Sequence, residues 1–176
     1  MSRVVARRSK LPFRSVNVRG EPSFQPDMQR HHLVPRQLLG TPGLICMLDD
    51  LGREQIGFDD FSRNGLLLPV TTSAAFRVGM PMHRGPHAHY NAMVAERVGQ
   101  IEAGWSDRRA ICPQAARGEA MFRLALLQQA LRRRLLDAGR GRLTLCRKDP
   151  FRPGQDFAEL DAMVDQLWAA TAPGKS

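Results

Sequence analysis

Histidine is the residue type in this sequence that is best suited to chemistry, because imidazole binds metal ions and accepts protons near neutral pH. The 176-residue chain has five histidines, and they fall in two clusters. The first cluster is His31 and His32, and the second is His83, His87 and His89. Two such clusters favour a shared metal or catalytic site over isolated structural residues.

The spacing within each cluster restricts what the histidines can do together. Neighbouring side chains on a strand point to opposite faces, so His31 and His32 are poorly placed to bind the same ion. One of them can bind a metal while the other reaches a nearby water molecule. His83 and His87 are four residues apart, which on a helix puts both on one face. The Gly-Pro pair at 85–86 places His83 just before the helix, so the pair converges only if His83 folds over the first turn.

Two short strands are predicted on either side of a helical insertion. Residues 28–34 and 66–68 have the character of strands, and a proline follows each of them. The intervening residues 36–60 suit one or two short helices around the Thr-Pro-Gly break at 41–43. The Asn-Gly pair at 64–65 is a turn signal.

Longer helices are predicted in the second half of the chain. A loop over 70–85 precedes a helix at about 86–101, in which a proline occupies the first turn. A second helix spans about 119–138, and a last one about 156–170. Residues 142–146 are predicted to form a late strand.

Three stretches of the sequence, taken in order, resemble one protein family. They are Arg-His-His-Leu-Val-Pro at 30–35, Asn-Gly-Leu-Leu-Leu-Pro at 64–69 and His-Arg-Gly-Pro-His-Ala-His-Tyr at 83–90. Together they resemble the AHH nucleases of the HNH and endonuclease-VII-like group, whose fold is the ββα-metal (His-Me) finger. Arg30 replaces the alanine of the family pattern, and His89 is additional.

The resemblance implies a role for each residue that matches the pattern. His31 is similar to the metal ligand on the first strand, and His32 to the general base that activates water. Asn64 is similar to the asparagine that holds the loop and orients the base. His83 and His87 are similar to the metal ligands on the helix side.

Substrate contacts are also implied near these motifs. Tyr90 matches the motif tyrosine, which either contacts phosphate or packs in the core. Arg30 and Arg84 flank the histidines and could hold phosphate groups. Two further arginines near the motif are Arg36 and Arg63.

The cofactor implied by this ligand set is one divalent metal ion. No acidic ligand is evident, because the two acidic pairs are better suited to helix capping or the surface: Asp49, Asp50, Asp59 and Asp60. Imidazole ligands suit Zn²⁺ and Ni²⁺, whereas phosphate oxygens that complete the shell keep Mg²⁺ and Mn²⁺ open. One ion can neutralise a phosphate and stabilise the leaving oxygen while a histidine takes the proton of water.

Charge favours a polyanionic partner. Lys and Arg total 26 and Asp and Glu total 17, which gives a formal net charge of +9. Nucleic acid is the first candidate and an anionic membrane surface the second. The nucleic acid that we expect is DNA, with RNA as the alternative. Aromatic residues make up 6%, so stacking on bases is not the main mode of recognition. No apolar stretch is long enough to span a membrane, and the basic N-terminus lacks the apolar core of a signal peptide.

Cysteine usage bears on the compartment. Cys46, Cys112 and Cys146 are far apart and form no CxxC motif, so we interpret them as small core residues in a reducing compartment. We therefore expect a cytoplasmic protein, with a secreted effector as the alternative. A toxin of this family would need an immunity protein as partner, and the sequence gives no basis for an oligomeric state.

The fold class expected is α+β, with a small ββα-metal finger embedded in a mainly helical domain. We predict a basic N-terminal arm at 1–27, a nuclease core at 28–104 and a helical extension at 105–176. The leading function is a metal-dependent endonuclease that hydrolyses phosphodiester bonds of DNA or RNA. The alternatives are a non-catalytic nucleic-acid-binding protein with a structural metal finger, and a protein-interaction factor.

Overall fold

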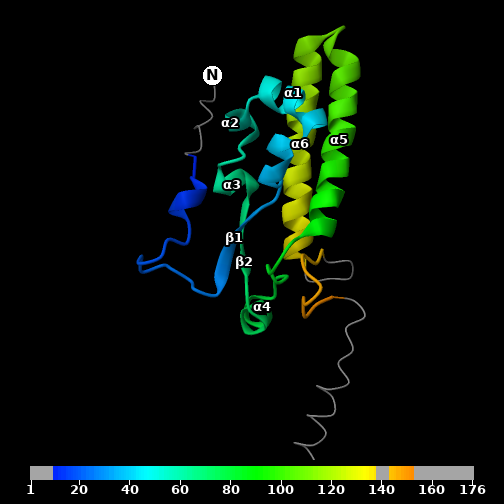
Figure 1. Cartoon of the computed structure of the whole chain (residues 1–176). Helices are drawn as coiled ribbons and strands as arrows, with labels where there is room; N and C mark the ends of the chain where they lie inside the picture. The colour runs from blue at the N-terminus through cyan, green and yellow to red at the C-terminus, as the bar shows by residue number, and fades with distance from the viewer. Residues whose placement is uncertain (1–9, 138–142, 153–176) are drawn as a thin grey trace, which may run out of the picture.

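The computed structural model describes residues 10–137 and 143–152. A two-stranded sheet lies beside two long helices (Figure 1), so the predicted α+β class is confirmed. Within these residues no helix is both long and apolar enough to cross a membrane. In chain order, with η for 3-10 helices, the elements are η1 (Phe13–Ser15), β1 (Met28–His32), η2 (Arg36–Gly40), α1 (Pro42–Leu51), α2 (Arg53–Ile56), α3 (Phe61–Asn64), β2 (Gly65–Pro69), α4 (Thr72–Val78), α5 (Ala88–Arg109) and α6 (Pro113–Leu136).

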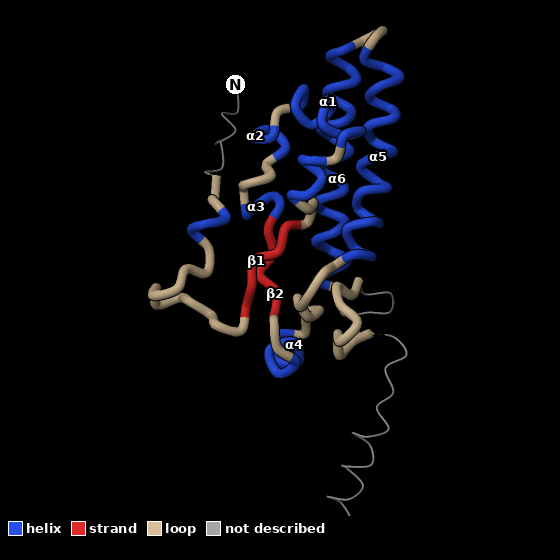
Figure 2. Tube along the Cα trace, viewed as in Figure 1, coloured by secondary structure: helices blue, strands red, loops and turns tan. Residues whose placement is uncertain are grey.

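Strands β1 and β2 pair in antiparallel register, with His31 opposite Leu66 and His32 opposite Gly65 (Figure 2). Both strands were predicted, but the 32 residues between them fold into η2 and α1 to α3 instead of a tight turn. His31 is 4% exposed, whereas His32 on the other face is half-buried. The pleat therefore separates the two histidines, as the alternation of strand side chains requires.

The Asn64–Gly65 pair is not the turn that the sequence predicts. Asn64 is the last residue of α3, and Gly65 opens β2 with φ −109°, an extended conformation. Glycine is required there by space, because a Cβ would lie 2.2 Å from the Phe61 ring. The Leu33 amide donates to the main-chain oxygen of Asn64 at 2.8 Å, one position beyond the last strand pair, His32 with Gly65. Because Asn64 belongs to α3, strand β1 ends at His32 and not at residue 34.

The core lies between the sheet, α1 and the two long helices α5 and α6, which run side by side (Figure 1). Helix α5 continues past its predicted end because Ile101 and Trp105 are buried in this core. Helix α6 begins at Pro113, earlier than predicted, since Ala116 and Ala120 extend its buried face toward the N-terminus. These apolar positions recur every three or four residues, as in a helix with one buried face.

The segment 70–85 is not the uniform loop that the sequence predicts, because it contains α4. Thr71 caps this helix: its hydroxyl accepts the Ala74 amide at 3.2 Å. Ala74 and Ala75 are completely buried and attach the helix to the rest of the fold. Threonine and serine are typical of loops and of helix N-caps alike, and here they form a cap.

The late strand predicted at 142–146 is wrong for the described residues 143–146, which have no regular structure. Leu145 is 4% exposed, so the segment packs against the core as an irregular stretch. Arg142 and the helix predicted at 156–170 lie outside the described residues.

The described part of the N-terminal arm, residues 10–27, is folded against the insertion. Pro12 forms an isolated β-bridge with Asp60, and the next residues form the short helix η1. Asp60 is 8% exposed, and its carboxylate accepts the amides of Leu11 at 3.2 Å and Ser62 at 3.0 Å. This acidic residue therefore acts as a helix cap, one of the two roles expected for the acidic pairs.

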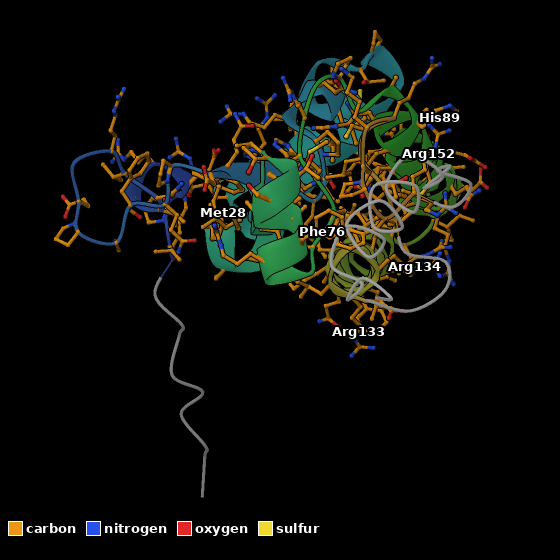
Figure 3. All side chains as sticks on the ribbon, turned by 90° about the horizontal axis from the view of Figure 1, so that it is seen from below. Met28, Phe76, His89, Arg133, Arg134 and Arg152 are labelled. Carbon is orange, nitrogen blue, oxygen red and sulfur yellow. The ribbon has the colours of Figure 1, made fainter. Side chains whose placement is uncertain are left out.

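The prediction that the cysteines are core residues is wrong, because Cys46 and Cys112 are exposed and Cys146 is half-buried. Cys46 lies on the exposed side of α1, Cys112 is the N-cap of α6, and Cys146 lies in the irregular segment after α6. Arg133 and Arg134 of α6 are also exposed and project away from the molecule (Figure 3).

Candidate metal centre

Three of the five histidines converge at the side of the sheet that faces α5. His31 projects from β1, His83 lies in the segment after α4, and His87 is the N-cap of α5. One nitrogen of each ring lies within 4.8 Å of the others. The His83 amide donates to the Pro69 carbonyl at 2.7 Å, which ties this segment to the end of β2. The structure thus brings together the three histidines for which the sequence predicts a ligand role.

The outward nitrogens of two of these rings are oriented by hydrogen bonds. His87 Nδ1 lies 3.0 Å from the Leu145 carbonyl, which can only accept, so Nδ1 carries the proton. His83 Nδ1 lies 2.9 Å from Gln29 Oε1 and donates to it in the same way. Both rings are therefore left with a lone pair on Nε2, the state that a metal ligand needs.

His31 supplies the test of whether the site fits a cation. Its Nε2 atom is buried and has no hydrogen-bond partner among the described residues. A buried polar atom without a partner is costly and uncommon in a folded protein. A cation held between His31, His83 and His87 would satisfy this atom, so the donor set fits a divalent metal ion of the kind that imidazole prefers.

Electrostatics keep the rings of His31 and His83 neutral. Burial, reinforced by His83, His87 and His32, lowers the pKa of His31 to about 2. Burial and the neighbouring His87 lower the pKa of His83 to about 4. Neutral imidazole is the metal-binding form, so both ligands are ready to bind at neutral pH without first losing a proton.

The same pKa shifts predict how the metal-free protein responds to acid. An unfolded chain binds protons at these histidines from about pH 6.5 downward, whereas the folded chain resists them until about pH 4. The unfolded state then binds more protons, so stability falls as the pH falls through this window. We expect the thermal unfolding midpoint of chelator-treated protein to drop between about pH 7 and pH 5. A thermal unfolding midpoint that stays constant or rises over that pH range would contradict the burial of these histidines.

Residues 143–152, which follow α6, make hydrogen bonds that support the candidate metal centre. Besides the bond from Leu145 to His87, Asp149 is completely buried, and its carboxylate accepts the Met82 amide at 2.8 Å. Met82 immediately precedes His83. This segment therefore holds the backbone directly before His83 and orients the ring of His87.

Gln29 and the Leu145 carbonyl were missed by sequence analysis. Gln29 lies two positions before His31 on β1, and residues two apart share a face of a strand. That spacing is a signal that could have identified Gln29. Leu145 lies 58 residues beyond His87 and contributes a main-chain atom, so no side-chain pattern could have indicated it.

Substitution of Gln29 tests its role as the hydrogen-bond partner that orients the His83 ring. Gln29→Leu should weaken metal affinity about 10–100-fold, the usual cost of losing such a partner, because the His83 ring loses its orientation. Gln29→Glu should tighten binding, since a carboxylate makes the imidazole a stronger donor. Competition with a fluorescent zinc chelator measures both. Equal affinities for the three proteins would rule out this hydrogen bond as a support of the centre.

His32 is not part of the three-histidine cluster. Its ring stacks on Phe13 from the N-terminal segment, with centroids 3.7 Å apart and an angle of 2° between the planes. Its Nε2 is buried without a hydrogen-bond partner among the described residues. Burial, together with the positive charges of Arg36 and Arg30 and against the opposing effect of Asp59, lowers the pKa of His32 to about 4. The ring is therefore neutral and can accept a proton.

Asn64 holds the chain that leaves β1. It is completely buried, and its side chain accepts the Val34 amide at 2.8 Å and donates to the Val34 carbonyl at 3.1 Å and the Phe58 carbonyl at 3.3 Å. Gln128 of α6 donates to the same side-chain oxygen at 3.4 Å. Asn64 thus fixes the backbone directly after His32, and α6 reaches the site through Gln128.

The buried bonds of Asn64 predict a large effect on stability. Asn64→Ala leaves the Val34 amide and two carbonyls without their partner, and each such group costs about 1–3 kcal/mol. We expect a loss of about 3 kcal/mol in the free energy of unfolding, measured by urea denaturation. Asn91→Ala is the matched control: Asn91 is half-buried on α5, and its loss should cost less than about 0.5 kcal/mol. Similar losses for both variants would contradict the structural role of Asn64.

The remaining predicted substrate residues differ in their surroundings. Tyr90 is 3% exposed, and its hydroxyl donates to the Leu33 carbonyl at 2.6 Å, a placement that favours core packing over phosphate contact. Burial raises the pKa of this hydroxyl. Arg30 is exposed and donates to the Phe13 carbonyl at 2.7 Å. Arg84 is exposed beside His83, and His89 is exposed on α5 outside the cluster.

The two other arginines near the motif are engaged elsewhere. Arg36 forms an ion pair with Asp59 at 2.9 Å, and Arg63 donates to the Gln55 carbonyl at 2.6 Å. Arg84 is therefore the motif arginine with the least constrained surroundings among the described residues.

Strands β1 and β2 and helix α5, with one histidine on β1, one in the segment before α5 and one at the N-cap of α5, define a ββα-metal finger. Nucleases of the HNH superfamily carry their divalent metal on such a finger. The sequence profile of AHH, a nuclease family of the HNH/ENDO VII superfamily with conserved AHH, matches residues 13–131. The chain therefore belongs to the AHH family, as its motifs indicate. No curated protein and no solved structure matches it.

The matched region exceeds the predicted nuclease core at both ends. It includes Phe13, which stacks on His32, and Gln128, which bonds to Asn64. The limits of that core, 28–104, stay a prediction.

Proposed function

We propose that this protein is a divalent-metal-dependent endonuclease that hydrolyses phosphodiester bonds of DNA. The observation that carries the proposal is the convergence of His31, His83 and His87, with a neutral His32 next to His31 in sequence and on the other face of β1. Membership of the AHH family supports a nucleic-acid substrate. The excess of basic residues, a net charge of +9, supports binding to a polyanion.

His31, His83 and His87 would hold the metal ion, which when bound neutralises phosphate charge and stabilises the leaving oxygen. His32 takes the proton of the attacking water on Nε2, the buried atom that lacks a partner among the described residues. Phe13 fixes the plane of the His32 ring by stacking on it. Arg84 contacts a phosphate beside the site, since its guanidinium is exposed next to His83.

The low pKa of His32 is compatible with this role. A base with a pKa of about 4 is a weak proton acceptor, but it is neutral at any physiological pH. The negative charge of a bound phosphate stabilises the protonated form of a nearby histidine and therefore raises its pKa. Substrate binding thus strengthens the base when it is needed.

The experiment that tests the proposed function is a cleavage assay after removal of metal. The full chain is stripped with a chelator and then supplied singly with Mg²⁺, Mn²⁺, Ni²⁺ or Zn²⁺. Plasmid DNA, single-stranded DNA and RNA serve as substrates. We expect metal-dependent cleavage of DNA. Binding to DNA without cleavage under any of these metals would refute the proposal and favour a non-catalytic binding protein with a structural metal finger.

A further inference from the structure

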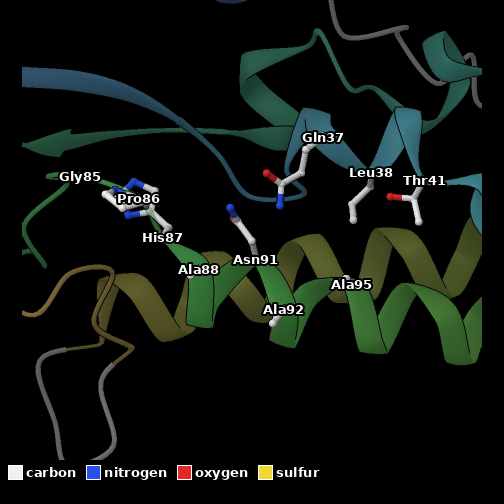
Figure 4. Close-up of a pocket in the computed structure, with 10 residues that line it drawn as sticks. All are labelled: Gln37, Leu38, Thr41, Gly85, Pro86, His87, Ala88, Asn91, Ala92 and Ala95. Atoms are coloured by element: carbon white, nitrogen blue, oxygen red, sulfur yellow. The ribbon is translucent and has the colours of Figure 1, made fainter.

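A groove of about 770 Å³ runs along the first half of α5 (Figure 4). His87 lines one end of it, so the groove and the metal centre share a residue. Its volume is within the range of about 300–1,000 Å³ that is typical of sites for small organic ligands. A molecule that reaches the metal can therefore extend directly into this groove.

The side of the groove formed by α5 is mostly apolar. Ala88, Ala92 and Ala95 lie on the same face of α5, because positions four and three apart are neighbours on a helix. Small methyl groups leave room for a planar group to lie against the helix. None of the lining residues is Lys, Arg, Asp or Glu, so the groove offers a phosphate no charge partner.

Two carboxamides supply the polar contacts. Gln37 comes from η2 on one wall and Asn91 from α5 on the other, and their side chains project toward each other across the groove (Figure 4). A carboxamide carries both a donor and an acceptor, and it pairs with the hydrogen-bonding edge of a base. Gln37 is exposed and Asn91 half-buried, so both groups are accessible to a ligand.

We propose that this groove binds a nucleobase of the strand being cut, next to the scissile phosphate, and that Gln37 and Asn91 contact its hydrogen-bonding edge. The inference rests on the proposed function, because the phosphate at the metal places the adjoining base in the groove. The uncharged alanine side of the groove suits the face of a base. Arg84 does not line the groove and is placed to contact phosphates instead. The groove thereby makes the enzyme sensitive to the base beside the cleaved bond.

A binding experiment tests this without cleavage. The full chain, loaded with Zn²⁺, is titrated into two fluorescent phosphorothioate oligonucleotides that resist hydrolysis. One carries all of its bases, and the other has the same backbone without bases. Fluorescence anisotropy gives both dissociation constants. We expect wild-type protein to bind the base-bearing strand about tenfold more tightly, the discrimination that one pair of well-placed hydrogen bonds provides.

Substitutions test which residues produce the difference in affinity between the two oligonucleotides. The double substitution Gln37→Ala and Asn91→Ala should bring the two affinities within about twofold of each other, because the carboxamides are removed. Gln100→Ala, an exposed glutamine further along α5, is the matched control and should leave the tenfold difference intact. Equal affinities in the wild type, or a full difference in the double variant, would overturn the inference.

The same proteins separate this inference from the proposed function. Failure of wild-type protein to cleave natural DNA or RNA refutes the nuclease activity, whatever the anisotropy shows. Cleavage together with equal affinity for the two oligonucleotides leaves the nuclease activity standing and removes the base site.

Discussion

His32→Ala should lower the DNA cleavage rate about 10²–10⁴-fold, the usual contribution of a general base, while the protein retains its metal ion. His32 lies on the face of β1 opposite His31 and is not among the three converging imidazoles. The substitution therefore removes a proton acceptor and leaves the ligand set intact. Single-turnover cleavage and metal content by mass spectrometry measure the two quantities on the same sample.

The control for this variant is His89→Ala. His89 is exposed on α5 and lies outside the histidine cluster, so its loss should change neither the rate nor the metal content. A His32→Ala protein that cleaves at the wild-type rate would exclude His32 as the base. Loss of both cleavage and metal would assign His32 to the metal centre instead.

His87→Ala should abolish stable metal binding and with it cleavage. Its ring supplies one of three nitrogens that lie within 4.8 Å of one another, and its Nδ1 is held by the Leu145 carbonyl. Loss of a ligand should exceed the roughly 10–100-fold loss of affinity that follows from loss of a supporting group. We therefore expect metal affinity to fall more than about 100-fold, measured by isothermal titration with Zn²⁺.

The corresponding changes at the other two ligands sharpen this test. His83→Ala should resemble His87→Ala, because both rings leave Nε2 free to bind. His31→Ala should lose the metal and also relieve the buried nitrogen that lacks a partner among the described residues. Full metal occupancy in any of the three variants would contradict a centre built from these imidazoles.

The parts of the site closest to the motifs were predictable from sequence. The sequence predicted strands at 28–34 and 66–68, each followed by a proline, and in the structure β1, which carries His31, pairs with β2. The three motif stretches predicted the family, which the profile match over 13–131 confirms. These features depend on short-range patterns, which a single sequence carries directly.

Other parts depend on long-range packing and could not be read from local patterns. Asn64 has the spacing of a turn residue, but its buried side chain instead joins Val34, Phe58 and Gln128. Helix α4 was not predicted from the sequence because threonine and serine are common in loops as well as at helix N-caps. Asp149 gives no signal of its own, since its partner, the Met82 amide, lies 67 residues away.

The long helices have a clearer role once these contacts are known. Gln128 of α6 reaches Asn64, and the segment after α6 supplies the carbonyl of Leu145 to His87 and the carboxylate of Asp149 to the backbone before His83. Leu145 and Asp149 lie beyond the residues that match the family profile. The candidate metal centre therefore draws support from residues outside the matched region.

Anomalous X-ray diffraction from crystals of the full chain grown with Zn²⁺ tests the central claim most directly. The account predicts one strong anomalous peak about 2.0–2.1 Å from a nitrogen of each of His31, His83 and His87, the usual zinc–histidine distance. It also predicts that His32 makes no bond to that peak. A peak at any other place, or three rings without zinc between them at saturating concentration, would contradict it.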